Sequence, residues 1–160
     1  MDIPILHSLL AFLFARRVLV KGWSMYPTLA PGERVLFDAL AYRRQEPRRG
    51  DVVLARHPSY PSMLLVKRVA AAPGDSVTAK DAEVVVEEPG SGNAPPPGAD
   101  AAAAVWTLGE DEYFLVGDAP DLSTDARHFG PVGRQDILAR AWLVYWPPRR
   151  FRAVRGLRAS

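Results

Sequence analysis

A serine, a lysine and one polar segment are the parts of this sequence whose residue types could catalyse a reaction. Ser24 lies between a strand-like approach, Val18 to Val20, and a turn that contains Pro27. Proline fixes its own φ and restrains the residue before it, so this turn would hold a hydroxyl on a rigid element at the edge of a cleft. Taken alone, the same pattern fits any serine that precedes a turn.

The lysine is Lys67, in the short apolar run from Met63 to Val69. Strand alternation places Leu65, Lys67 and Val69 on one face. An amine among apolar groups is costly to charge, so its pKa falls, and a neutral amine can accept a proton from a serine hydroxyl. The alternative is an edge-strand lysine whose amine reaches water.

The polar segment runs from Gly117 to Val132 and follows an apolar strand-like run. Ser123 could form a hydrogen bond with a nearby amine, and Asp125 could pair with Arg127 to hold the loop. The alternative is a turn whose Asp and Ser side chains satisfy the local backbone, which is their usual role.

The elements around these residues are predominantly β. Short apolar runs alternate with Pro- and Gly-containing turns, which is typical of an antiparallel sheet or a barrel-like domain. We expect strands near residues 34–37, 51–55, 63–69, 84–86, 113–116 and 141–145.

The sequence divides into three parts. Residues 1–17 form a short apolar segment, residues 18–148 the catalytic domain, and residues 149–160 a basic tail rich in arginine. Within the domain, residues 88–104 are rich in Pro, Gly and Ala and predict a surface excursion between two strands. The tail is expected to be solvated, or to be drawn to anionic lipid headgroups.

Composition restricts the classes of function. The chain has 160 residues, of which 48% are hydrophobic, enough for one domain with a core. The net charge of +2 gives no case for nucleic acid as a partner. The chain has no cysteine, which excludes disulfides, thiolate catalysis and cysteine-based zinc sites. We expect no metal and no organic cofactor.

The apolar segment Ile3 to Ala15 would be about 20 Å long as a helix, shorter than the roughly 30 Å hydrocarbon core. Three arrangements are open: a helix lying on a membrane, a short span, or a helix packed on the domain. If the segment spans, Arg16 and Arg17 would hold the domain on the cytoplasmic side.

Three blocks, in this order, resemble the successive conserved boxes of type I signal peptidases. They are Gly22-x-Ser24-Met25-x-Pro27-Thr28-Leu29, then Val66-Lys67-Arg68-Val69 with Pro73-Gly74-Asp75, then Gly117-Asp118 with Ser123-x-Asp125-x-Arg127 and Phe129-Gly130-Pro131-Val132. The strand Arg49 to Val53 and the closing run Ala141 to Pro148 resemble the same family. The likeness extends from about Val18 to Pro148, nearly the whole chain.

The resemblance implies a mainly β fold with two antiparallel sheets. It also implies a serine endopeptidase that cleaves after small residues and binds its substrate as an added strand. Ser24 would be the nucleophile and Lys67 the general base. Ser123 would orient the lysine amine, and Asp125 with Arg127 would form a structural ion pair beside the site. The backbone N–H of Ser24 would hold the oxyanion.

The chain departs from the family pattern in several positions. Some relatives carry a hydroxyl two residues before the nucleophile, where this chain has Gly22. The third block has Ala119 and Ala126 where Asn and Ser are usual. The N-terminal segment is shorter than the usual anchor, and its arginine pair lies on the unexpected side.

Other functions were weighed against the peptidase. A base from His7, His57 or His128 is disfavoured because Lys67 occupies the position of the base. An inactive membrane-bound adaptor would not need both Ser24 and Lys67. A self-cleaving repressor would need a DNA-binding module before Ser24, and too little chain precedes it.

Two substrates remain open for a peptidase. One is the signal peptide of many precursor proteins, and the other is the leader of a nickel-type superoxide dismutase. The segments Arg56-His57-Pro58 and Tyr145 to Pro148 resemble the maturation proteases of the latter. The full third block favours general signal peptide removal. We expect a precursor protein and a membrane surface as partners, with the domain on the outer face of the cytoplasmic membrane.

Overall fold

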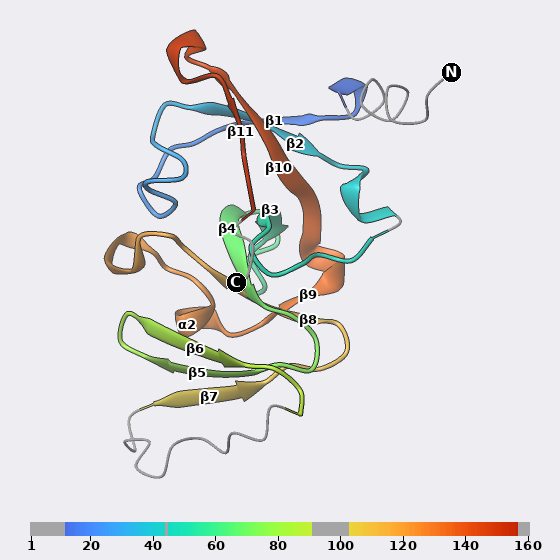
Figure 1. The fold of residues 1–160 in the computed structure, drawn as a ribbon, viewed down its shortest axis with the longest axis vertical. Helices are drawn as coiled ribbons and strands as arrows, with labels where there is room; N and C mark the ends of the chain where they lie inside the picture. The colour runs from blue at the N-terminus through green and yellow to red at the C-terminus, as the bar shows by residue number, and fades with distance from the viewer. Residues whose placement is uncertain (1–11, 44, 91–102, 157–160) are drawn as a thin grey trace.

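The computed structural model describes residues 12–43, 45–90 and 103–156, which form two antiparallel β-sheets (Figure 1). The large sheet has the order β1-β2-β10-β3-β4-β8-β9, with β11 paired to β10, and the small sheet has the order β6-β5-β7. Their strands are β1 Arg16–Leu19, β2 Arg34–Asp38, β3 Val52–Arg56, β4 Leu64–Ala71, β5 Ser76–Lys80, β6 Glu83–Glu87, β7 Ala104–Thr107, β8 Glu112–Val116, β9 Val132–Gly133, β10 Ile137–Trp146 and β11 Arg152–Ala153.

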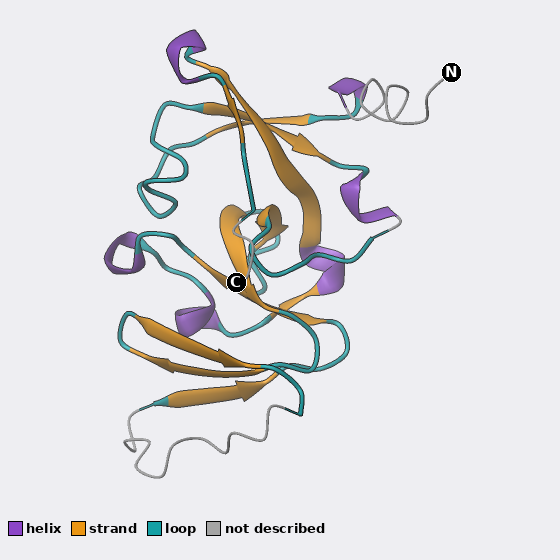
Figure 2. Ribbon diagram, in the orientation of Figure 1, coloured by secondary structure: helices purple, strands orange, loops and turns teal. Residues whose placement is uncertain are grey.

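Apart from Phe12 and Leu13, which are helical just before β1, helical structure in the described ranges consists of single turns in the connections (Figure 2). One of them, α2, follows the polar loop and is capped by Asp125, whose carboxylate accepts a hydrogen bond from the Arg127 amide. These turns are α2 Ala126–Phe129, η1 Ala41–Arg43, η2 Pro120–Leu122, η3 Arg134–Asp136 and η4 Pro148–Arg150.

Strand β3 lies at the centre of the core because both of its faces are covered. Val52 and Leu54 belong to one apolar cluster, whereas Val53 and Ala55 belong to another. Successive side chains of a strand point to opposite faces, so an unbroken apolar run is what a strand buried on both sides requires. A third cluster, which includes Val77 and Phe114, joins the small sheet to the large one.

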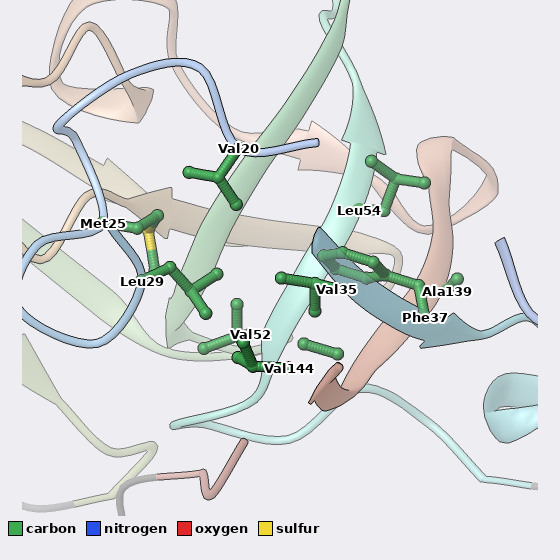
Figure 3. Packing of buried hydrophobic residues seen from close by; sticks show 10 residues of the cluster. Val20, Met25, Leu29, Val35, Phe37, Val52, Leu54, Ala139 and Val144 are labelled. Atoms are coloured by element: carbon green, nitrogen blue, oxygen red, sulfur yellow. The ribbon is translucent and has the colours of Figure 1, made fainter. Parts of the chain in front are cut away.

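The segment that follows β1 is fastened to the first of these clusters. Val20, Met25 and Leu29 come from this segment and pack against Val35 and Val144 of the large sheet (Figure 3). Met25 is 1% exposed and Leu29 is fully buried. Burying apolar side chains of this size stabilises their placement by about 1.5–3 kcal/mol each, so the segment is not a free loop.

The mainly β fold with two antiparallel sheets is confirmed, and each of the six expected strands is present within a few residues. Two strands of the small sheet were missed. In β5, Val77 and Ala79 are buried on alternate positions, but the run is short and its other residues, Ser76, Thr78 and Lys80, are polar. Strand β7 begins at Ala104, the last residue of the expected excursion, of which residues 91–102 lie outside the described ranges.

The expected apolar helix at the N-terminus is not shown. Most of it falls on residues 1–11, which lie outside the described ranges, and the chain enters β1 already at Arg16. Arg16 and Arg17, expected to end the N-terminal segment, instead pair with Phe37 and Leu36 of β2. Arg16 and Arg17 are thus part of β1, whereas their charge alone had suggested that they end the N-terminal segment.

Candidate active site

Ser24 lies in the loop between β1 and β2, and this loop is closed at its base. The Val20 amide donates to the Glu33 carbonyl at 2.9 Å, and the Gly32 amide donates to the Val20 carbonyl at 2.8 Å. We refer to residues 20–33 as the nucleophile loop. Inside it, the Leu29 amide donates to the Met25 carbonyl at 2.8 Å. Ser24 itself is half-buried beside the anchored Met25.

A second contact ties Ser24 to the polar segment of the third block. The Ala119 amide donates to the Ser24 carbonyl at 3.0 Å. Gly117 lies so close that a Cβ at this position would be 2.5 Å from the Ser24 carbonyl oxygen and 2.2 Å from Ser123 Oγ. Only glycine allows the two segments to approach to this distance.

Lys67 is on β4 and is almost completely buried, at 4% exposure. Its Nζ donates to Ser123 Oγ at 2.8 Å. Burial lowers the pKa of Lys67 from its ordinary value of 10.5, and Arg127 lowers it further, while Asp125 and Asp118 oppose the shift. The amine is therefore easier to deprotonate than a lysine in water.

Ser123 is one member of a buried chain of hydrogen bonds that starts at Lys67. Ser123 Oγ donates to Asp125 Oδ2 at 2.7 Å, and the Gly117 amide donates to the same oxygen at 2.9 Å. The Arg127 Nε donates to Asp125 Oδ1 at 2.9 Å. Burial alone would raise the pKa of the fully buried Asp125, but its bonds with Arg127, Gly117 and Ser123 more than offset this and lower the pKa. The carboxylate therefore stays charged and orients the serine hydroxyl.

An ion pair next to Lys67 holds the two loops together. Arg68 donates to both carboxylate oxygens of Asp118 at 2.7 Å and also to Thr28 Oγ1 at 3.0 Å. The two charged side chains are 7% and 12% exposed. Arg68 thus connects the nucleophile loop with the third block, an interaction that the sequence pattern did not reveal.

Ser24 and Lys67 line the same groove, whose volume is about 250 Å³. Its remaining walls are predominantly apolar and consist of Val18, Leu19, Val20, Lys21, Gly22, Met25, Leu54, Leu64, Leu65 and Val66. Strand β8 pairs with β4 only from Arg68 to Ala71, so the edge of β4 from Leu64 to Lys67 has no strand partner on that side among the described residues. The groove therefore offers an open strand edge beside the serine.

A wider, open hollow of about 690 Å³ lies on another side of Ser123 and includes Asp121 and Arg127 in its lining. It includes neither Ser24 nor Lys67. Because Ser24 and Lys67, the expected nucleophile and base, must both reach the reacting atoms, the groove, and not this larger hollow, is the candidate active site.

The two histidines of the described ranges, His57 and His128, take no part in the groove. The ring of His57 packs 4.7 Å from that of Phe129, and His128 Nδ1 accepts a hydrogen bond from the Asp125 amide at 3.4 Å. Neither lines the groove, and His7 lies outside the described ranges. Across the described residues, no group of three or more His, Asp or Glu side chains is arranged to hold a metal ion.

Within residues 12–43, 45–90 and 103–156, no helix has the length and apolar character needed to traverse a bilayer.

The chain is similar to proteins of one known family over most of its length. Residues 3–146 match the sequence model of the family described as signal peptidase, peptidase S26. The mitochondrial ATP-independent inner membrane protease subunit 1a of Arabidopsis thaliana is 36% identical over 137 residues, which cover 85% of this chain and 73% of that protein. The probable signal peptidase I-2 of Synechocystis sp. is 29% identical over 143 residues, covering 80% of this chain and 62% of that protein.

A solved structure of a signal peptidase I from Enterococcus faecalis V583 overlaps weakly, with a TM-score of 0.45 and 21% identity over 60% of this chain and 97% of that one. The family match extends over nearly the whole chain, and the Arabidopsis relative is more than 30% identical over most of it. The chain therefore belongs to the signal peptidase family, peptidase S26, whose members are serine endopeptidases.

Proposed function

We propose that this enzyme removes N-terminal signal peptides from precursor proteins through a dyad of Ser24 and Lys67. Family membership gives the reaction class, a serine endopeptidase of signal peptide processing. The observation that carries the dyad is the groove shared by Ser24 and a buried, hydrogen-bonded Lys67. Burial lowers the pKa of Lys67 and so favours its neutral amine, which is the form that can activate a serine without a histidine.

The reaction follows from these positions. Neutral Lys67 takes the proton of the Ser24 hydroxyl, and the serine oxygen attacks the scissile carbonyl carbon. The oxyanion is stabilised by the Ser24 N–H, which has no acceptor among the described residues. Lys67 then gives the proton to the leaving amine, and the acyl-enzyme remains. The amine of Lys67 next takes a proton from a water molecule, which hydrolyses the acyl ester, and the returned proton frees Ser24.

The walls of the groove support a preference for small residues. Met25 and Leu54 are buried side chains and limit its depth, while the unpaired edge from Leu64 to Lys67 offers backbone groups to an extended peptide. Backbone pairing supplies affinity and shallow pockets supply specificity in this mode of recognition. We infer that the segment before the cleavage site adds as a strand at this edge.

We also infer that the enzyme works at a membrane surface. Leu19 and Leu64 line the groove and are 49% and 51% exposed, and Trp23 next to the nucleophile is 54% exposed. Apolar and aromatic side chains grouped around a site, with Lys21 and Arg34 nearby, suit an interface with anionic lipid. Binding to vesicles with anionic headgroups should exceed binding to neutral vesicles and fall with salt. The outer face of the cytoplasmic membrane stays a prediction.

The test of the dyad is cleavage of a precursor peptide that carries a small-x-small site. The full chain is compared with Ser24→Ala and Lys67→Met, and with Ser62→Ala and Lys80→Met as exposed controls. Both dyad variants should lose activity by about 10³-fold or more while remaining folded, and the controls should cleave normally.

Two outcomes would contradict the proposal. If Lys67→Met kept substantial activity, another group would be the base. If the wild type were folded but inert toward signal peptides, the leader of a nickel-type superoxide dismutase is the next substrate to try. Failure there as well would leave the inactive adaptor as the better interpretation.

A further inference from the structure

The chain beyond β10 returns along the sheet instead of extending into solvent as a free basic tail (Figure 1). After η4, strand β11 pairs with β10 so that Arg152 lies opposite Val144 and Ala153 opposite Leu143. The Val154 amide then donates to the Trp142 carbonyl at 2.9 Å. Arg152 is therefore held at a fixed position beside the large sheet.

Arg152 uses its fixed position to contact the nucleophile loop. Its Nη1 donates to Glu33 Oε1 at 2.8 Å, and its Nη2 donates to Glu33 Oε2 at 3.0 Å and to the Thr28 carbonyl at 2.6 Å. A paired donation from guanidinium to carboxylate fixes geometry as well as charge. Thr28 is four residues after Ser24, so the contact reaches the catalytic part of the loop.

Glu33 connects Arg152 with a second point of the nucleophile loop. Its side chain is 1% exposed, and its Oε2 also accepts a hydrogen bond from the Ala30 amide at 2.9 Å. Burial would raise the pKa of Glu33, but the bonds with Arg152 and Ala30 outweigh burial and lower it. The buried carboxylate is therefore charged and needs cationic partners. Arg150 Nη1 lies 3.3 Å from Glu33 Oε1, but Arg152 is the residue that donates to both carboxylate oxygens.

The loop is thus held from two directions at Thr28. Arg152 binds the Thr28 carbonyl, and Arg68, the neighbour of the base Lys67, binds the Thr28 hydroxyl. Met25 and Leu29 fix the side chains on the inner side of the loop. The C-terminal segment is the only one of these anchors that lies beyond residues 3–146, the range matched by the family.

We propose that Arg152 is a positioning residue for catalysis, which acts through Glu33 and Thr28 to hold Ser24 at the right distance from Lys67. This inference rests on the proposed dyad. A serine displaced by about 1 Å from its productive position can lose about 100-fold in rate. The segment after β10 therefore contributes to catalysis by positioning the nucleophile loop.

The test compares Arg152→Ala, Arg152→Lys and the double variant Glu33→Gln/Arg152→Ala with the wild type. Arg149→Ala is the matched control, because Arg149 is an exposed arginine of the same segment whose side chain forms no hydrogen bond or ion pair with another described residue. Measurements are kcat on a signal peptide substrate, its pH profile, urea unfolding, and amide hydrogen exchange of residues 20–33.

Arg152→Ala should lower kcat by about 10- to 100-fold and speed up amide exchange in the nucleophile loop. Arg152→Lys should recover part of kcat, since it restores charge but not the paired donation. In Arg152→Ala the buried carboxylate keeps only its ion pair with Arg150, and the double variant removes that charge, so its stability should recover while its kcat stays low. The pH midpoint should not move, because Lys67 keeps its surroundings, whereas general loosening would admit water and raise that midpoint.

A double variant that is stable and has wild-type kcat would overturn the proposal, as would an Arg149→Ala variant that loses as much as Arg152→Ala. If the wild type cleaves nothing, the proposed function fails. Amide hydrogen exchange of residues 20–33 then tests by itself whether Arg152 holds the loop. Unchanged exchange of residues 20–33 in Arg152→Ala would show that it does not hold the loop.

Discussion

The amine of Lys67 donates a hydrogen bond to the hydroxyl of Ser123 at 2.8 Å, although the two residues are 56 positions apart in the chain. The hydroxyl in turn donates to the buried carboxylate of Asp125. This arrangement keeps the lysine amine at the wall of the groove while burial makes its charged form costly. The activity and the stability of the enzyme should therefore both depend on the cost of charging Lys67 and on the close packing around it.

The activity of the enzyme should rise with pH along a limb that reports the Lys67 pKa, with a midpoint below 10.5. Only the neutral amine can take the proton of Ser24. Asp125 raises the Lys67 pKa and Arg127 lowers it, so Asp125→Asn should move the midpoint to lower pH, besides reducing the rate. The measurement is kcat/KM against pH. A midpoint that moves upward in Asp125→Asn would contradict this account.

Lys67→Met should abolish cleavage yet increase the free energy of unfolding at pH 7. Between its lowered pKa and 10.5, Lys67 binds fewer protons in the folded chain than in the unfolded one, so wild-type stability rises with pH in this window. Each pKa unit corresponds to about 1.4 kcal/mol. Methionine removes the cost of burying the amine.

Urea unfolding of the wild type and Lys67→Met at several pH values measures this effect. The gain from methionine should shrink as pH approaches 10.5, and Lys80→Met, at an exposed lysine, should show no such trend. A loss of stability in Lys67→Met that is equal at all pH values would mean that the buried amine costs the fold nothing.

Gly117→Ala should inactivate the enzyme and destabilise it by about 1–3 kcal/mol, the usual cost of overpacking. The new methyl group would lie 2.2 Å from Ser123 Oγ and 2.5 Å from the Ser24 carbonyl oxygen, so both must move. Gly109→Ala is the control, because its nearest neighbour is at 3.4 Å, an ordinary contact. Thermal unfolding and cleavage rates measure the two effects, and an active, stable Gly117→Ala would show that the loops are not tightly apposed.

Gly22→Ser should raise kcat, by up to about tenfold, and leave stability unchanged. No atom lies within 4 Å of a Cβ at Gly22, so the side chain fits. A hydroxyl two residues before Ser24 would add a donor for the oxyanion, and one such donor is worth about 10²-fold or more when fully preorganised. Gly22→Ala lacks the donor and should match the wild type. Equal rates for the two variants would show that the hydroxyl does not reach the oxyanion.

Part of the fold could be read from local pattern. The run that became β3 is apolar because both faces of this strand are buried, and such a run stands out in any sequence. Strand β5 could not be recognised in the same way, since only Val77 and Ala79 are buried and their neighbours Ser76, Thr78 and Lys80 are polar. The start of β1 at Arg16 could not be recognised from local sequence, because these residues become a strand only by pairing with β2. The charges of Arg16 and Arg17 suggested instead the end of a membrane segment.

The chemistry of the site was determined by the sequence alone: a serine before a restrained turn, a lysine among apolar neighbours, and a Ser-x-Asp-x-Arg segment. Only the tertiary structure decided which of them meet. Long-range strand pairing places Ser24 and Lys67 in one groove, and burial there, not residue type, lowers the lysine pKa. The contact of Arg152 with Glu33 and Thr28 spans well over a hundred residues, and no local pattern encodes it because its geometry exists only once β11 has paired with β10.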